Sequence, residues 1–180
     1  EALDKAARML GLGYPGGAIL EKFARQGDPN SYPLPIPMAG KEDRLEFSFS
    51  GIKTAMYKLV EKEKPLTSKK IYNLAATFQD RTFQHVERII KKILGKYSFK
   101  EFFLAGGGAA NIELRKRIRK ICRKNNILFK VPYSKKLCTD NAAMIGVAAY
   151  FKYKKGDFLK PNNLKIVDRI PNAIVGTSLD

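Results

Sequence analysis

The sequence predicts a helix-rich α/β fold, and three observations support this prediction. Short apolar segments at 101–105 and 127–131 have the composition of strands and flank one helical segment, so we expect them to be parallel. Elsewhere, apolar residues recur at steps of three and four, which is the period of amphipathic helices. Hydrophobic residues make up 44% of the chain, enough for a packed core and unlike an intrinsically disordered protein.

Two short helices are expected at the start of the chain. The first covers 1–10 and ends at glycines 11 and 13, which tolerate a positive φ. After a turn at 14–17, the second helix covers 18–25 and ends at Gly27. Prolines 29, 33, 35 and 37 then exclude regular helix, so we expect an irregular excursion over 28–46.

Two further helices are expected in the middle of the chain. One runs from Ile52 to about Lys62 and is broken by Pro65. The other keeps the apolar spacing of a helix over some six turns, from Ile71 to Ile93, and is the longest element predicted. Beyond it, the strand at 101–105, glycines 106–108 and a helix over 110–125 form a βα unit.

The last predicted helix covers 140–153, and a polar tail covers 154–180. Because the amphipathic pattern is already present at residue 1 without a cap, we expect the chain to begin inside a larger protein. We therefore interpret 1–153 as part of a larger folded unit.

Charge is the strongest compositional signal. The chain carries 34 Lys and Arg against 17 Asp and Glu, a formal net charge of +17, which favours a phosphate-rich partner. Only Cys122 and Cys138 are present, and they form no CxxC motif, so we expect a reduced, cytoplasmic protein. No apolar run approaches the roughly 20 residues that a membrane-spanning helix needs, so we expect no membrane partner.

Glycines 106, 107 and 108 stand between a strand and a helix. Backbone N–H groups and the positive end of a helix converge at such a turn, which suits a phosphate or a nucleotide. The run is neither GxGxxG nor a P-loop, so tight packing is an equal alternative. Asn111 follows the glycines and is either a ligand contact or a helix cap.

Asp140 opens the last predicted helix within a Thr-Asp-Asn sequence. It is either an N-cap or a metal ligand at the sheet edge where α/β proteins bind ligands. As a metal ligand it would need partners from outside this chain, because His85 is the only histidine. His85 itself is interpreted as a surface or core residue of the long helix.

Two other features of the sequence bear on its chemistry. Seven Lys and Arg residues cluster at 115–124, either as a solvated face or, as we favour, as a surface for a nucleic-acid backbone. Ser48 and Ser50 precede Gly51, but no GxSxG motif and no base accompany them. We therefore expect no protein nucleophile, and assign the serines to local hydrogen bonding at the helix start near Ile52.

Six motifs, in order, resemble one family, the tRNA threonylcarbamoyladenosine transferases (TsaD), formerly labelled glycoproteases. The resemblance extends from residue 1 to about 148. The motifs are Glu1-Ala2-Leu3-Asp4-Lys5, Leu10-Gly11-Leu12-Gly13-Tyr14-Pro15-Gly16-Gly17, Phe47-Ser48-Phe49-Ser50-Gly51-Ile52-Lys53-Thr54-Ala55, Ala75-Ala76-Thr77-Phe78-Gln79, Ala105-Gly106-Gly107-Gly108-Ala109-Ala110-Asn111 and Cys138-Thr139-Asp140-Asn141-Ala142-Ala143-Met144.

The resemblance implies the actin-like ATPase (ASKHA) fold of sugar kinases and Hsp70, with a nucleotide cleft between two lobes. This chain would supply most of the second lobe. It implies an iron or zinc ion held by Asp140 and by two His of an HxxxH motif in the first lobe, which is missing here. It also implies adenylate contacts at Asp4, Gly17, Glu21 and Asn111, beside Gly106, Gly107 and Gly108.

The implied reaction transfers threonylcarbamoyl from threonylcarbamoyl-AMP to the adenosine 3′ of the tRNA anticodon, with the metal as a Lewis acid. Arg115, Arg119, Lys120 and Arg123 become the expected tRNA contacts. Implied partner subunits are TsaB and TsaE of bacteria or those of a KEOPS complex. We expect the chain alone to be inactive. The alternatives are a non-catalytic nucleotide- or RNA-binding module of the same fold and, with little residue support, a metalloprotease.

Overall fold

The computed structural model describes residues 1–157, and the chain divides after Thr139 into two compact units. None of the helices in these residues combines the length and apolarity needed to cross a bilayer. The elements of the first unit are α1 (Ala2–Met9), α2 (Gly17–Ala24), η1 (Glu42–Arg44), α3 (Ser50–Glu63), α4 (Ser68–Lys96), β1 (Glu101–Phe103), η2 (Gly107–Ala110), α5 (Ile112–Lys124), β2 (Leu128–Lys130) and η3 (Lys135–Cys138). The second unit holds α6 (Ala142–Lys154).

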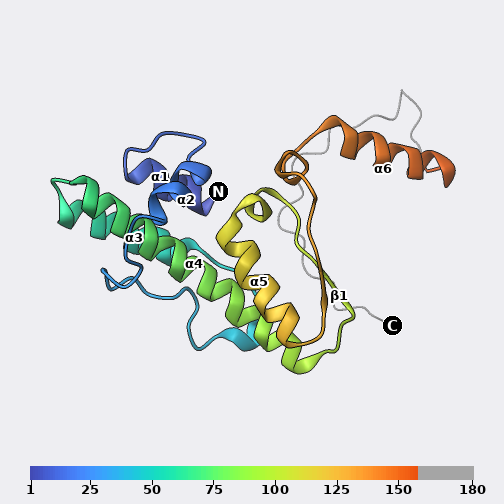
Figure 1. Ribbon diagram of the computed structural model, residues 1–180, viewed down its shortest axis with the longest axis horizontal. Helices are drawn as coiled ribbons and strands as arrows, with labels where there is room; N and C mark the ends of the chain where they lie inside the picture. The colour runs from blue at the N-terminus through green and yellow to red at the C-terminus, as the bar shows by residue number, and fades with distance from the viewer. Residues whose placement is uncertain (158–180) are drawn as a thin grey trace. The chain divides into compact units, whose positions relative to one another are not determined.

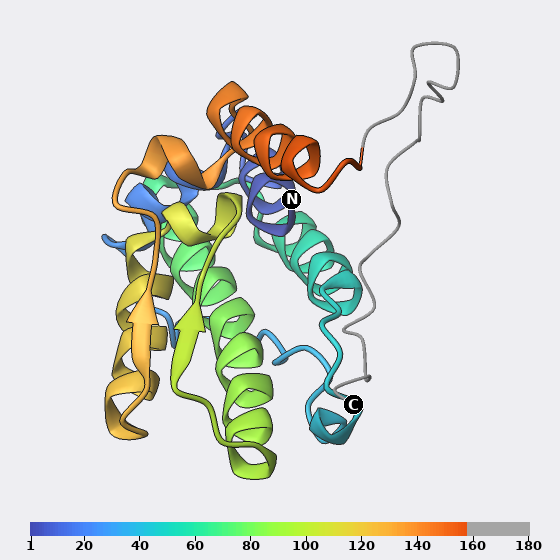
Figure 2. The ribbon, with the colours of Figure 1, turned by 90° about the vertical axis from the view of Figure 1, so that its right-hand side faces the viewer.

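The sheet of the first unit has two parallel strands, as the βα pattern predicts. Phe102 of β1 is paired in register with Phe129 of β2, and their rings pack with centroids 6.3 Å apart. Figure 2 shows the strands side by side, with α5 and α4 beyond them. The α/β prediction is confirmed at this level.

The long helix α4 organises the first unit. Its 29 residues correspond to about 43 Å at 1.5 Å per residue. The helices α1, α2 and α3 pack along its first half and α5 along its second half (Figure 1). The first hydrophobic cluster includes Leu74 and Phe78 of α4, and the second includes Phe83 and Ile90. One helix therefore joins two cores.

Several predicted boundaries were wrong by a few residues. The helix expected from Ile52 begins at Ser50. No side chain caps it, so the predicted hydrogen bonding of the serine side chains at its start is not observed. The helix expected from Asp140 begins at Ala142, and Asn141 is its cap, because the Asn141 side-chain oxygen accepts the N–H of Met144 at 3.0 Å. The excursion over 28–46 is irregular as predicted, except for the single turn η1. Most of the predicted polar tail lies outside the described residues.

His85 lies on α4 and is buried in the protein core, with 1% of its surface exposed. Its Nε2 atom accepts the main-chain N–H of Ser48 at 3.3 Å, and the rings of Phe47 and Phe49 pack edge-on against it. The core alternative for His85 is therefore the one observed. Burial lowers the pKa of the imidazole. The Glu42 carboxylate raises this pKa and Arg88 lowers it further, and the net pKa lies below the usual value.

The buried His85 predicts an acid-sensitive contribution to stability. Because the folded pKa lies below the unfolded value of about 6.5, the unfolded chain binds more protons at mildly acidic pH. The contribution is therefore complete above about pH 6.5 and is lost as the pH falls from there through the folded pKa. Urea denaturation at pH 7.5 and pH 5 measures it, and His85→Gln should show a smaller loss between the two. An equal loss in both proteins would contradict the prediction.

The contact of Gly27 with α4 predicts a second effect. A Cβ atom at Gly27 would lie 2.0 Å from the main-chain oxygen of Tyr72, which cannot move aside as a side chain can. Gly27→Ala should lower the free energy of unfolding by about 1–3 kcal/mol, as overpacking does. Gly51→Ala is the matched control, because Gly51 in α3 has open space around its Cβ position and alanine favours helix by about 0.5–1 kcal/mol. Thermal unfolding that ranks the two variants in the opposite order would refute this.

Candidate functional site

The glycine loop follows β1 and leads into α5. Gly106 has φ +81° and ψ 173°, a conformation that only glycine adopts readily. Gly107 and Gly108 begin the short turn η2, and all three glycines are exposed, with open space where a side chain would lie. Within residues 1–157 their N–H groups have no hydrogen-bond acceptor. The loop thus presents free main-chain donors at the carboxyl end of a strand, which suits an anionic group.

Asp4 and Gly17, predicted to lie at one site, are in direct contact. The Asp4 Oδ1 atom accepts the N–H of Gly16 at 3.0 Å and that of Gly17 at 2.8 Å, so α1 satisfies the first donors of α2. Burial raises the pKa of the Asp4 carboxyl, but these hydrogen bonds and the amino group of Glu1 more than offset it and hold the pKa below its usual value. Asp4 is therefore ionised and fixed.

Glu21 connects α2 to α5. The residue is 6% exposed, and its Oε1 atom accepts the N–H of Ile112 at 3.0 Å, at the first residue of α5. The same oxygen accepts from Arg25 at 2.7 Å. A carboxylate at a helix N-terminus accepts from an N–H group that has no partner within the helix, and its negative charge interacts favourably with the helix dipole. In this structure Glu21 therefore holds the start of α5.

Asn111 is buried and acts as the N-cap of α5. Its Oδ1 atom accepts the N–H of Leu114 at 3.0 Å, so the cap alternative is observed. Its Nδ2 atom donates to Oε1 of Gln79 in α4 at 3.0 Å, and its main-chain N–H donates to the carbonyl of Gly108 at 3.1 Å. Asn111 thus joins the glycine loop to two helices.

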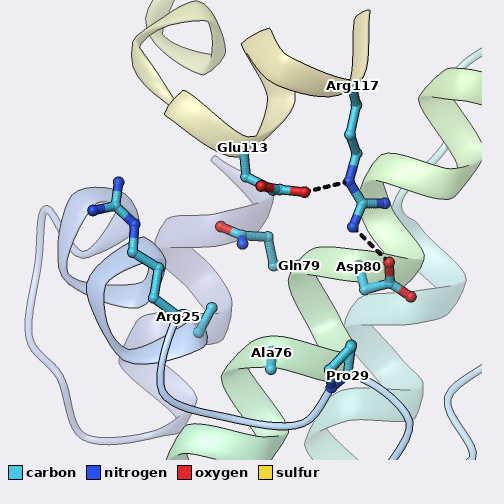
Figure 3. A pocket seen from close by; sticks show the side chains of 8 residues that line it. Arg25, Pro29, Ala76, Gln79, Asp80, Glu113 and Arg117 are labelled. Atoms are coloured by element: carbon cyan, nitrogen blue, oxygen red, sulfur yellow. Dashed lines mark hydrogen bonds and ion pairs between the residues drawn. The ribbon is translucent and has the colours of Figure 1, made fainter. Parts of the chain in front are cut away.

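A small pocket of about 150 Å³ lies next to this cap, between α2, α4 and α5 (Figure 3). Arg117 lines it and pairs with Asp80 at 2.7 Å and with Glu113 at 2.9 Å. Burial lowers the pKa of Arg117, but the hydrogen bonds from Arg117 to Glu113 and Asp80 outweigh it and raise the pKa above its usual value. The remaining lining residues are Ala24, Arg25, Pro29, Ala76 and Gln79.

The cationic side chains of the basic helix α5 lie in two settings, bonded within the fold or exposed to solvent. Arg115 is tied to the fold, because its Nε atom donates to the carbonyl of Ala109 and its Nη2 atom lies 3.2 Å from Sγ of Cys138. Arg119, Lys120 and Arg123 are exposed, and the Arg119 guanidinium stands 5.6 Å from the centroid of the Phe129 ring. Lys116 and Lys124 are exposed as well, so five cations of α5 face solvent, a feature that suits a phosphate backbone.

Asp140 is exposed and lies outside the first unit. Asn141 rather than Asp140 caps α6, so the carboxylate is not consumed by the cap. No cluster of three or more potential His, Cys, Asp or Glu ligands occurs in the described part of the chain. Asp140 offers a single oxygen-donor side chain, which cannot by itself hold a metal ion.

The structure therefore places four of the predicted residues along α1 and α2 and at the start of α5. Asp4 bonds to Gly17, Glu21 lies one turn further along α2 and reaches α5, and Asn111 lies at that same end of α5. Sequence reasoning missed Gln79, although a polar residue on the apolar face of a long helix is a visible signal.

Comparison with known proteins gives the same family name for the family model and for the relatives. The family model described as "TsaD: tRNA N6-adenosine threonylcarbamoyltransferase" matches residues 1–147. A protein of that name from Campylobacter fetus subsp. fetus is 41% identical over 171 residues, covering 94% of this chain and 50% of the relative. A protein of the same name from Symbiobacterium thermophilum is 45% identical over 157 residues, covering 87% of this chain and 45% of the relative. This chain spans about half the length of the curated relatives it matches.

The link between Glu21 and α5 predicts a stability effect. Glu21→Ala leaves the partly buried N–H of Ile112 without an acceptor and should lower the free energy of unfolding by about 1–3 kcal/mol. Glu21→Gln keeps an acceptor oxygen and should lose less. Glu61→Ala is the surface control, because Glu61 pairs with Lys64 in solvent and such pairs contribute about 0–1 kcal/mol. Urea midpoints compare the three, and equal losses in all would exclude a special role for Glu21.

Proposed function

This chain belongs to the TsaD family, and we propose that it supplies the adenylate-holding part of a tRNA N6-adenosine threonylcarbamoyltransferase. The observation that supports the proposal most directly is the glycine loop. Its free N–H groups lie beside Asn111, and Asn111 is linked through α5 to Glu21. These are the motif residues that the family resemblance associates with the adenylate.

The proposed reaction is an acyl transfer. The exocyclic amine of the tRNA adenosine attacks the carbonyl carbon of threonylcarbamoyl-AMP, so that a C–N bond forms and the amine loses a proton. The bond between that carbonyl carbon and the phosphate oxygen breaks, and AMP leaves. The N–H groups of the glycine loop would hold the phosphate as charge develops on it. No serine or cysteine nucleophile is required.

Asp140 is proposed as one ligand of the metal that the resemblance implies. Its exposed carboxylate, which the α6 cap does not use, fits that role, and the other donors must come from outside residues 1–157. When bound, an iron or zinc ion supplies Lewis-acid polarisation. The chain's own contribution at this point is a single carboxylate.

We also propose the finer architecture and the partners. The parallel βα unit and the helices around it are compatible with the second lobe of an ASKHA protein, which would need a first lobe to close the cleft. The exposed Arg119, Lys120 and Arg123 would contact tRNA, and subunits of the TsaB and TsaE type would complete the assembly. Arg115 would instead support the loop through Ala109.

Salt dependence tests the proposed tRNA surface. Each phosphate contact contributes about one unit to the slope of log K against log salt. Changing Arg119, Lys120 and Arg123 together to Gln should therefore reduce that slope by about three. Lys58, Lys62 and Lys69 are exposed on α3 and α4, and changing them to Gln is the control of equal charge. Equal reductions in both triple variants would mean that tRNA senses only the net charge.

A chimera tests the enzymatic proposal. The part of the Campylobacter fetus relative that the match leaves out is joined to this chain, and formation of threonylcarbamoyladenosine on tRNA is measured. We expect modification by the chimera, none by the 180-residue chain alone, and a loss of about 100-fold or more in an Asp140→Ala chimera. A folded chimera that binds tRNA but modifies none would instead support the binding-module alternative. Transfer by the isolated chain would overturn the prediction that it is inactive.

A further inference from the structure

Gln79 is a polar residue in an apolar setting. It lies on α4 directly after Phe78, and only 6% of its surface is exposed. A buried carboxamide costs free energy unless its atoms find partners, so its contacts are informative. The Oε1 atom has one partner in the first unit, the Nδ2 atom of Asn111 at 3.0 Å, across 32 residues of sequence.

The Asn111 side chain makes hydrogen bonds on two sides, and the contact with Gln79 is one of them. The main-chain N–H of Leu114 can only donate, so the Asn111 oxygen must face it and the Asn111 nitrogen must face Gln79. The oxygen of Gln79 is the acceptor that this nitrogen needs, so Gln79 completes the hydrogen bonding of the Asn111 side chain. Through its own main chain, Asn111 then bonds to Gly108 of the glycine loop.

The start of α5 is consequently held from two sides. On the α2 side, Glu21 accepts the N–H of Ile112. On the α4 side, Gln79 holds Asn111, the residue before it. Figure 3 shows the side chain of Gln79 between α4 and the start of α5, bordering the pocket that Arg117 and Glu113 line. The glycine loop leads directly into this doubly held point.

We propose that Gln79 is a positioning residue that sets the glycine loop and the first turn of α5 by holding the Asn111 side chain. Its importance for catalysis rests on the proposed function of that loop. Its positioning action does not, because it concerns hydrogen bonds that exist without a ligand. Gln79 would act through Asn111 and would not touch the substrate.

Hydrogen exchange on the full chain tests the positioning directly. In Gln79→Leu, the exchange rates of the Ile112 and Leu114 N–H groups should rise about tenfold or more. The rates are compared with that of the Ile89 N–H, because Ile89 is a buried residue of α4 that reports global unfolding. Gln79→Glu retains an acceptor oxygen and should restore most of the protection. Gln84→Leu is the matched control, because Gln84 lies on the same helix but donates to Asp80 instead.

Binding of AMP to the same variants separates the two proposals. AMP affinity should fall about tenfold in Gln79→Leu and change less than threefold in Gln84→Leu, as a lost positioning contact of moderate strength would give. Unchanged exchange at Ile112 and Leu114 in Gln79→Leu, or an equal change in Gln84→Leu, would overturn the positioning role. If exchange responds as expected but the unchanged chain does not bind AMP, the positioning role stands and the proposed adenylate site in this chain fails.

Discussion

The burial of one helix, α4, is the constraint on which the first unit depends. Its first half packs against α1, α2 and α3, and its second half packs against α5 and the sheet, so neither core forms without it. Most polar side chains buried on such a helix must find hydrogen-bond partners, although the hydroxyls of Thr77 and Thr82 have none within the described residues. His85 and Gln79 meet this requirement by accepting from Ser48 and Asn111, segments far away in the sequence. The packing of apolar residues around α4 thereby determines where the hydrogen bonds of His85 and Gln79 form.

The candidate site is built from groups whose hydrogen bonds are already made. Asp4, Glu21 and Asn111 each satisfy N–H groups at the start of a helix, which leaves the exposed main chain of the glycine loop as the free set of donors. Such an arrangement is preorganised, because its geometry does not need to be created when a ligand arrives. The motif residues support the site, and the loop offers the contacts.

The sequence was sufficient for the elements with strong local signals. The long apolar period over 71–93, the glycines after the first strand and the parallel pairing were predicted, because periodicity and turn chemistry determine them. The positions of caps were less accessible: Asp140 and Asn141 are equally good caps by type, and only the backbone path selects Asn141. The partner of Gln79 could not be predicted, because a contact across 32 residues depends on how α4 and α5 pack.

The composition of α6 has a consequence for handling the protein. Its aromatic side chains, Tyr150, Phe151 and Tyr153, are all exposed, and none of its residues is buried within the described part of the chain. Mutual repulsion between copies, from a net charge of +17, opposes contact between such helices. The range of this repulsion shrinks from about 30 Å at 0.01 M salt to about 8 Å at 0.15 M. The isolated chain should therefore be most soluble in dilute buffer, and added salt should promote its aggregation.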